Sequence, residues 1–209
     1  MARDIQPPFE AEIPSLDTMR VESLQIPEVR LITPPKLTDQ RGFLSETYSR
    51  RFLVEAGIDL EFVQDNHSLS AEVGTIRGLH FQSPPYAQAK LVRVVRGAIL
   101  DVAVDIRQGS PTFGYHAHAV LSADNWSQIF IPEGFAHGFC TLEPDSQVLY
   151  KVSDYHAPDH DLGLAWNDPA LGIDWPVSEA EAVLSDKDRA QPRLAQLRIY
   201  FVYEPMTKG

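Results

Sequence analysis

Short segments in which apolar and polar residues alternate fill most of the chain from about residue 27 to residue 156. They are rich in Val, Ile, Phe and Tyr, and turn signals such as DQRG, SPP, GSP and EPD separate them. Such regular spacing is typical of an antiparallel sandwich or barrel. The pattern therefore predicts a mainly β protein, whose strand segments are EVRLIT, LEFVQDN, GTIRGLHF, KLVRVV, AILDVAVDI, YHAHAVL, SQIFIP, AHGFCTL and QVLYKV.

A few segments break the strand pattern. Residues 49–56 predict one short helix, and residues 178–184, SEAEAVL, predict another because a serine N-cap precedes acidic residues of a first turn. The final stretch, QLRIYFVYEPMTKG, predicts a late strand and a loose tail. No repeat or low-complexity linker divides the chain, so we expect a single domain over residues 1–209.

The segment AILDVAVDI has two different faces, because side chains alternate across a strand. One face carries aliphatic side chains only, and the other carries two aspartates. The acidic face would either meet solvent or line a polar cavity inside a barrel, and the sequence leaves both possibilities open. The aliphatic face consists of Leu100, Val102, Val104 and Ile106, and the acidic face of Asp101, Ala103 and Asp105.

Composition narrows the class of protein. The single cysteine, Cys140, excludes an internal disulfide and favours a reducing cytoplasm, with the thiol as a buried small hydrophobe. A net charge of −11 argues against nucleic acid as a partner, although a few arginines in one pocket could still bind a small anion. The first twenty residues lack the apolar core of a signal peptide, and charges interrupt the most apolar stretch, so we expect no membrane span.

One candidate chemistry is metal binding. The segment IPEGFAHGF places Pro132, Gly134 and His137 in a P-x-G-x-x-H spacing that resembles the second motif of cupin barrels. A metal-binding cupin also needs an H-x-H pair followed by Glu. The segment GLHFQ has only His80, with Gln82 in the second histidine position, and the H-x-H of YHAHAV comes late with no following Glu. Metal catalysis is therefore disfavoured, though still open.

The other candidate chemistry is proton abstraction next to a carbonyl. It needs a base, a cation near the enolate oxygen, an acid on the opposite face, and a carboxylate behind the base. The chain offers a residue for each role, but residue types alone make only an inventory. The candidates are His80 as base, Lys90 or Arg77 as cation, Tyr150 as acid, and Asp101 or Asp188 as the supporting carboxylate.

Eight segments follow one another along the chain: FVQDNHSLS, IRGLHFQ, AKLVRVVRG, DVAVDIRQGSPTFG, LSADN, IPEGFAHGF, LYKVSDYHAP and WNDPALGIDWP. In this order they closely resemble the dTDP-4-dehydrorhamnose 3,5-epimerases of nucleotide-sugar biosynthesis. The resemblance runs from about residue 41 to residue 188. It implies a cupin-type antiparallel β-barrel or jelly roll with a few short, mostly C-terminal helices. Residues 1–25 and 198–209 would be extensions of this core.

The resemblance also implies a role for each matching residue. His80 matches the catalytic base, Asp188 in LSDKD its partner, Tyr150 the acid on the opposite face, and Lys90 the cation near the enolate. Asp101 has no such match and stays a candidate, from the residues alone, for a supporting position behind the site. The positions that match substrate-binding residues are Arg41, Glu46, Gln64, Asn66, Arg77, His137 and the aromatic Trp166.

The implied reaction inverts C3 and C5 of a dTDP-4-keto-6-deoxyhexose, since both carbons flank the C4 ketone. No metal or cofactor is implied. A homodimer is implied, in which an N-terminal strand of one chain often completes the other's sheet. The alternatives are a mono-epimerase, a metal-dependent cupin oxygenase or isomerase, and a binding module without catalysis.

Two features complicate the match. Arg77 and His80 are three residues apart, which places them on opposite faces of a regular strand unless a bulge at Gly78 re-aims one of them. The family pattern usually has two aromatic residues before the A-P of the LYK segment. Here Tyr155-His156 stand there, so the shape of the sugar pocket, and the number of carbons inverted, stay open.

Overall fold

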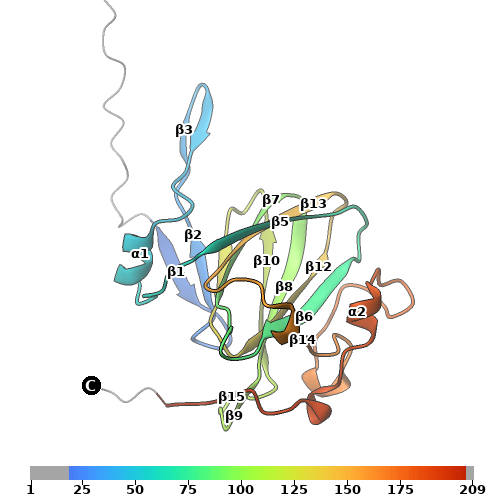
Figure 1. Ribbon diagram of the computed structural model, residues 1–209. Helices are drawn as coiled ribbons and strands as arrows, with labels where there is room; N and C mark the ends of the chain where they lie inside the picture. Colours follow the sequence, from blue (N-terminus) through green and yellow to red (C-terminus); the bar gives the residue numbers. More distant parts are fainter. Residues whose placement is uncertain (1–18, 206–209) are drawn as a thin grey trace, which may run out of the picture.

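Two antiparallel sheets face each other and form the body of the protein, for which a computed structural model describes residues 19–205 (Figure 1). One sheet has six strands, in the order β1 (Arg20–Ser23), β2 (Arg30–Thr33), β11 (Gln128–Ile131), β7 (Lys90–Arg96), β13 (Ser146–Val152) and β5 (Gln64–Ser70). The other has five, in the order β10 (His116–Ser122), β8 (Ala98–Asp105), β12 (Phe135–Thr141), β6 (Ile76–Gln82) and β14 (Asp161–Gly163). This jelly-roll-like barrel confirms the prediction of a mainly β fold.

The remaining elements lie outside the two main sheets. A hairpin of β3 (Leu37–Asp39) and β4 (Gly42–Leu44) projects from it, and β9 (Arg107–Gln108) pairs in parallel with β15 (Phe201–Val202) (Figure 1). The helices are short: α1 (Arg50–Glu55) and α2 (Asp186–Arg189), with 3-10 turns η2 (Pro158–His160), η3 (Pro169–Leu171) and η4 (Leu194–Gln196). As predicted, most of these helical turns lie in the C-terminal part. No helix in residues 19–205 is long and apolar enough to cross a membrane.

Aliphatic and aromatic side chains fill the space between the two sheets. They come from alternate positions of the strands, as the period of two requires, and the largest are almost fully buried. A second cluster lies on the outer face of the six-stranded sheet, where Phe52 and Leu53 of α1 pack against Leu91 and Phe130. The central cluster includes Val92, Val94, Ile99, Ala103, Ile129, Ile131, Phe135, Phe139 and Val148.

Strand β8 is buried on both faces, which answers the question left by its alternating sequence. Ala103 packs between the sheets, so Asp101 and Asp105 on the same face point inward, and both are fully buried. Val102 and Val104 face outward and are covered by apolar residues of the C-terminal part of the chain. Neither face meets solvent, and the acidic face belongs to the barrel interior.

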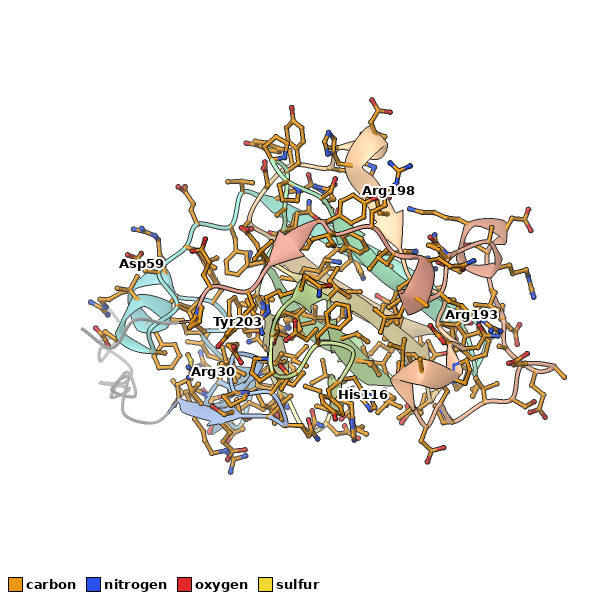
Figure 2. The ribbon with its side chains drawn as sticks, turned by 90° about the horizontal axis from the view of Figure 1, so that it is seen from below. Arg30, Asp59, His116, Arg193, Arg198 and Tyr203 are labelled. Carbon is orange, nitrogen blue, oxygen red and sulfur yellow. The ribbon has the colours of Figure 1, made fainter. Side chains whose placement is uncertain are left out.

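The C-terminal segment from Arg193 to Tyr203, called the strap below, crosses one face of the barrel. Seen from below, the part that carries Arg193, Arg198 and Tyr203 lies over the strands (Figure 2). Tyr200 and Phe201 of the strap pack against Phe81. The predicted late strand is β15, and the tail beyond residue 205 lies outside the described residues.

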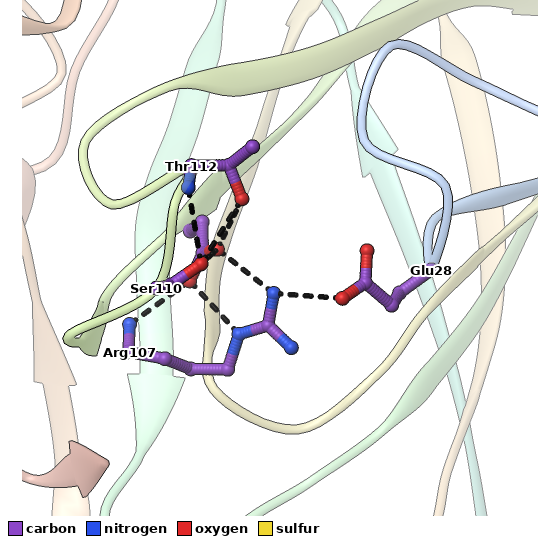
Figure 3. Close-up of polar contacts among 5 residues, drawn as sticks. Glu28, Arg107, Ser110 and Thr112 are labelled. Atoms are coloured by element: carbon purple, nitrogen blue, oxygen red, sulfur yellow. Dashed lines mark hydrogen bonds and ion pairs between the residues drawn. The ribbon is translucent and has the colours of Figure 1, made fainter. Parts of the chain in front are cut away.

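A buried ion pair between Asp105 and Arg107 lies at the end of β8, next to the strap. Two guanidinium nitrogens of Arg107 donate to Asp105 at 2.9 and 2.8 Å, and one also donates to Glu28 at 3.2 Å (Figure 3). The hydroxyls of Ser110 and Thr112 donate to the same aspartate at 2.6 and 2.7 Å. Burial alone would raise the pKa of Asp105, but these hydrogen bonds outweigh burial and lower it. The guanidinium also stacks over the rings of Phe135 and Tyr203.

One helix prediction is confirmed and one is wrong. The helix predicted at residues 49–56 is α1, with Ser49 as its N-cap. The helix predicted at residues 178–184 is only an irregular turn, because Val183 bonds through its backbone to Gly74 and Ile76 and forms an isolated bridge with Thr75. This tertiary pairing extends the chain there, and the helix begins only at Asp186.

The ends of the chain contribute to the fold beyond the region of resemblance. Residues 20–23, which fall inside the predicted N-terminal extension, form β1 at the edge of the six-stranded sheet. Residues 1–18 of that extension lie outside the described range.

Candidate functional site

Two adjoining cavities open between the edges of the two sheets. Their volumes are about 420 and 370 Å³, and His80, Lys90 and Tyr150 line both of them. The larger cavity is completed by Ser68, Thr75, Ile76, Arg77, His137, Phe139, Val183, Leu184, Ser185 and Asp188. The smaller is completed by Gln64, Asn66, Phe81, Gln82, Gln88, His156 and Asp161. Most of the residues singled out in the sequence therefore meet here.

A bulge in β6 brings Arg77 and His80 to the same cavity. Along β12, His137 faces His80 and Phe139 faces Arg77, so three steps of β6 oppose two steps of β12. Gly78, with φ of +124°, provides the extra residue. A Cβ on Gly78 would lie 2.5 Å from the Cα of Gly138, so the strands approach this closely only without side chains. The bulge that the sequence left open at Gly78 is therefore present, and it resolves the conflict between Arg77 and His80.

His80 and Asp188 form a hydrogen-bonded pair. Their atoms Nε2 and Oδ1 are 2.6 Å apart, and the second carboxylate oxygen accepts the Ser185 hydroxyl at 2.6 Å. Ser185 is also the N-cap of α2, where its hydroxyl accepts the Asp188 amide. Burial opposes ionisation of Asp188, but the hydrogen bonds from His80, Ser185 and the Gly78 amide outweigh burial and lower its pKa. The carboxylate is therefore charged at neutral pH and fixes the tautomer of His80 with a proton on Nε2.

Lys90 is a buried residue in the lining of both cavities. It is 8% exposed, and its ammonium donates to the carbonyl of His80 at 3.3 Å. Burial lowers the pKa of Lys90 to about 8, while the negative charges of Asp161 and Asp101 oppose that fall. At neutral pH the lysine carries a positive charge in a largely dry place, where a cation acts strongly on a neighbouring oxygen.

Behind Lys90, His137 and Asp101 form a second buried pair. Nε2 of His137 lies 2.9 Å from Oδ2 of Asp101. Burial lowers the pKa of His137 despite this carboxylate, so its ring is neutral and donates to Asp101 through Nε2. The other oxygen of Asp101, fully buried, has no hydrogen-bond partner among residues 19–205. On the acidic face of β8, Asp101 is therefore buried behind His137, which lines the larger cavity, and does not itself line it.

Tyr150 stands on β13, in the sheet opposite the one that carries His80. Burial raises the pKa of its phenol, so the hydroxyl keeps its proton well above neutral pH. On the neighbouring strand β5, Gln64 donates to the side chain of Asn66 at 2.9 Å, and its carbonyl oxygen accepts the backbone amide of His156 at 3.2 Å. His80 therefore lies on one side of the cavities and the protonated Tyr150 on the other, and the side-chain amides of Gln64 and Asn66 line the smaller cavity beside them.

Arg77 lies at the rim of the larger cavity. It donates to the Ser70 hydroxyl and to the Leu69 carbonyl, both at 3.0 Å, and the residue remains exposed. These bonds hold the guanidinium in place and leave donors for an anion.

Three of the residues singled out lie away from the two cavities. Trp166 is buried behind the wall, in a cluster with Ile76, which lines the larger cavity. Arg41 and Glu46 are exposed, and Arg41 pairs with Asp39 at the tip of the projecting hairpin. Within one chain, therefore, the hairpin does not contribute to the cavity lining.

Two residues that support the site, Gln82 and Asp161, were not assigned to it from the sequence. The Gln82 side chain donates to the carbonyls of Tyr86 and Tyr155 and accepts the amide of Ala157, so it joins the two loops beside the smaller cavity. Gln82 stands in the same segment as His80, and that adjacency was the only signal in the sequence.

The histidines of the H-x-H segment are not part of this site. The rings of His116 and His118 lie 5.5 Å apart on β10, which is an edge strand of the five-stranded sheet. Nδ1 of His116 lies 3.1 Å from the carbonyl oxygen of Leu171. Among residues 19–205, no group of three or more His, Cys, Asp or Glu side chains has an arrangement that could hold a metal ion.

Comparison with known proteins finds close relatives. Residues 23–196 match the family model described as dTDP-4-dehydrorhamnose 3,5-epimerase. A protein of that name from Sinorhizobium fredii is 51% identical over 188 residues, which cover 90% of this chain and 96% of the relative.

Comparison with solved structures also finds relatives among the epimerases of dTDP-sugars. An epimerase from Legionella pneumophila in complex with dTDP-4-keto-L-rhamnose superimposes with a TM-score of 0.84 at 42% identity, covering 89% of this chain and 99% of that one. A 3'-monoepimerase from Streptomyces bikiniensis in complex with dTDP-quinovose gives 0.76 at 35% identity, covering 83% and 87%. The sequence match, the fold and the coverage of most of the chain lead to one conclusion: this chain belongs to the dTDP-4-dehydrorhamnose 3,5-epimerase family.

Proposed function

We propose that the protein is an isomerase that inverts C3 and C5 of dTDP-4-keto-6-deoxy-D-glucose by proton transfer next to the C4 ketone. The observation that carries the proposal is the placement of His80, backed by Asp188, and Tyr150 on opposite sheets around one cavity, with Lys90 lining it between them. Family membership supports the same substrate class.

His80 is the proposed base. Because Asp188 occupies Nε2, the ring presents Nδ1 as the nitrogen that can accept a proton. It removes the hydrogen from C3 or C5, and the electron pair of the broken C–H bond moves into the enolate formed with the C4 oxygen. The charged Asp188 stabilises the imidazolium that results.

Tyr150 is the proposed acid. Its phenol, kept protonated by burial, delivers a proton to the opposite face of the enolate carbon, so the configuration inverts. His80 then releases its proton to solvent and Tyr150 takes up a proton from solvent, so both groups return to their starting states. The same pair serves both carbons if the sugar ring turns between the two steps, since one ketone acidifies both positions.

Lys90 is the proposed stabiliser of the enolate oxygen. Burial lowers the pKa of Lys90 to about 8, so the ammonium is still charged at neutral pH. A hydrogen bond from such a buried cation to a developing oxyanion lowers the barrier most where water is excluded. His137 and Asp101 support the lysine from behind, and the unpartnered oxygen of Asp101 leaves an acceptor on that side.

The remaining residues are proposed to hold the nucleotide. Arg77, with free donors at the rim, suits the pyrophosphate, and the amides of Gln64 and Asn66 suit the deoxyribose and base. Trp166 acts only through the wall that it supports. A reducing cytoplasm, the proposed location, suits the buried thiol of Cys140.

We further propose a homodimer. Arg41 and Glu46 match substrate-binding positions, yet neither lines the cavities of its own chain, and the hairpin that carries Arg41 projects from the barrel (Figure 1). Phe43 and Leu44 on this hairpin are 54% and 71% exposed, which favours contact with another surface. The hairpin would then reach the cavity of the partner, and Phe43→Asp should yield a monomer by light scattering with weaker dTDP binding. A monomeric wild type would refute this arrangement.

A mono-epimerase is the second candidate. His156, which stands where the family pattern has an aromatic residue, lines the smaller cavity and can alter how the sugar turns. A 3'-monoepimerase is among the structural relatives.

The test is proton NMR of dTDP-4-keto-6-deoxyglucose incubated with the protein in D₂O. Loss of the H3 and H5 signals supports the double epimerase, and loss of one signal identifies a mono-epimerase. His80→Ala should abolish exchange while dTDP still binds by calorimetry. Unchanged H3 and H5 signals with the wild type would refute the proposal, and exchange retained by His80→Ala would remove His80 as the base.

A further inference from the structure

A single ion pair joins helix α2 to strand β14. Nζ of Lys187 lies 2.5 Å from Oδ2 of Asp161. Lys187 directly precedes Asp188, the partner of His80, and Asp161 stands two residues before Gly163, which faces His80 across the β14–β6 ladder. The ion pair thus connects the helix that carries Asp188 to the strand beside His80.

Other contacts fix the chain on both sides of the helix, and before it the backbone of Val183 pairs with Gly74 and Ile76. The Gln191 side chain lies over Gly163, where a Cβ would come within 2.4 Å of it, and the Pro192 carbonyl accepts the Ala165 amide at 2.8 Å. These contacts fix the chain that leaves α2. Within α2, Asp188 bonds to His80, and Lys187 bonds to Asp161, which lines the smaller cavity.

The ion pair contributes little to stability. The side chains of Lys187 and Asp161 are 45% and 23% exposed, and partly exposed pairs of this kind typically contribute about 0–1 kcal/mol. Its placement has a larger consequence, because α2 is only four residues long and cannot hold its position alone.

The two members of the pair also act on the cavity as charges of opposite sign. Asp161 raises the pKa of Lys90 and of Tyr150, whereas Lys187 lowers the pKa of Lys90. The polar groups around Lys90 come from six elements: His80 of β6, Asp101 of β8, His137 of β12, Tyr150 of β13, Asp161 of β14 and Lys187 of α2.

We propose that Lys187 and Asp161 are positioning residues for proton transfer: their ion pair clasps α2 so that Asp188 stays behind His80, and it holds the Asp161 carboxylate beside Lys90 and Tyr150. The inference rests on the proposed function, because it gives the Lys187–Asp161 ion pair a role in the reaction at His80. It makes two predictions that a purely structural contact would not meet.

The first prediction concerns the rate. Lys187→Met and Asp161→Asn break the same ion pair, so both should lower kcat for deuterium exchange by about 10- to 100-fold, the loss expected when a catalytic group is misplaced by about 1 Å. The KM should change much less. Lys187→Arg keeps the charge and should restore most of the rate. Arg96→Met is the matched control, because it breaks an exposed ion pair with Asp145 that lies outside both cavities.

The second prediction concerns the titration of Lys90. Asp161→Asn removes a negative charge and should lower the pKa of Lys90 below about 8, whereas Lys187→Met removes a positive charge and should raise it. We expect shifts of roughly 0.5 to 1 unit in opposite directions. The NMR signals of the lysine side chains report this directly, with Lys90→Arg for assignment, and the alkaline limb of kcat/KM should move with them.

The outcomes separate the inference from the function on which it rests. Variants that keep the wild-type rate, or shift the Lys90 titration in the same direction or not at all, overturn the inference. If the wild type itself shows no exchange, the proposed function fails. The NMR titration needs no substrate and still decides whether the ion pair sets the charge around Lys90.

Discussion

Replacing Asp188 by asparagine tests the central pair of the site with the smallest change in shape. The carboxylate is 5% exposed and accepts hydrogen bonds from His80 Nε2 and from the Ser185 hydroxyl, each at 2.6 Å. The amide of asparagine has only one acceptor oxygen, so it cannot satisfy both donors. Its NH₂ group must face one of them.

The size of the effect follows from these contacts. A hydrogen bond to a charged group contributes about 1.5–3 kcal/mol, which corresponds to roughly a 10- to 150-fold loss if only the orientation of His80 suffers. If the NH₂ group faces the ring, the imidazole must carry its proton on Nδ1, the proposed base atom. The loss in kcat should then approach the whole contribution of a general base, about 10²–10⁴-fold. KM should change little, because Asp188 is not proposed to contact the substrate.

The same substitution should alter the pH dependence of stability. The folded-state pKa of Asp188 is lowered, so the carboxylate stabilises the fold at pH values above its unfolded pKa, near 3.9. That contribution disappears as the pH falls through the folded-state value. The difference in unfolding free energy between wild type and Asp188→Asn should therefore be present at pH 7 and vanish in acid.

The assay is deuterium exchange by NMR at several pH values, with thermal unfolding in parallel. Asp186→Asn is the matched control, because Asp186 is an exposed acid in the first turn of the same helix. The control should keep the wild-type rate. A rate for Asp188→Asn within about threefold of wild type, well below the loss expected for one charged hydrogen bond, would refute the reasoning.

Three further predictions follow from the cavity, the bulge and the buried ion pair. Tyr150→Phe should reduce formation of inverted product by about 10²–10⁴-fold while exchange catalysed by His80 persists; NMR measures both, and equal losses would contradict the assignment of the acid. Gly138→Ala places a Cβ 2.7 Å from the Arg77 carbonyl oxygen, so we expect a lower melting temperature, a cost of about 1–3 kcal/mol and reduced exchange; unchanged melting and exchange would show that the two strands separate easily. Asp105→Asn should cost about 3 kcal/mol in denaturant unfolding at pH 7, because it removes the anion that the Arg107 guanidinium neutralises. Since the folded-state pKa of Asp105 is lowered, this cost should shrink as the pH falls below about 4, and a cost independent of pH would argue against a charged Asp105.

The sequence predicted the strand content of the barrel well, because alternation of apolar and polar residues is a local property with a period of two. The residues that the resemblance assigned to the site also line the two cavities, except Arg41, Glu46 and Trp166. Trp166 is one of these: an aromatic residue beside a site and one that packs behind its wall look the same in a sequence.

Local patterns failed where a distant partner decided the outcome. SEAEAVL has the residues of a helix start, yet pairing of Val183 with Gly74 and Ile76 extends it. The strand AILDVAVDI alternates as a half-solvated strand would, yet the C-terminal segment covers its aliphatic face and the barrel encloses its acidic one.

The sequence by itself determined which chemistry was available: a histidine, a tyrosine, a lysine and two aspartates in recognisable segments, on a chain whose alternation builds sheets. Only the tertiary structure decided that His80 meets Asp188, 108 positions away, and that Tyr150 lies on the opposite sheet. Only the structure placed the Lys187–Asp161 pair at the cavity rim. The reason is physical, since side-chain identity and periodicity are local, whereas hydrogen bonds, burial and the pKa shifts that follow depend on which distant strands the fold brings together.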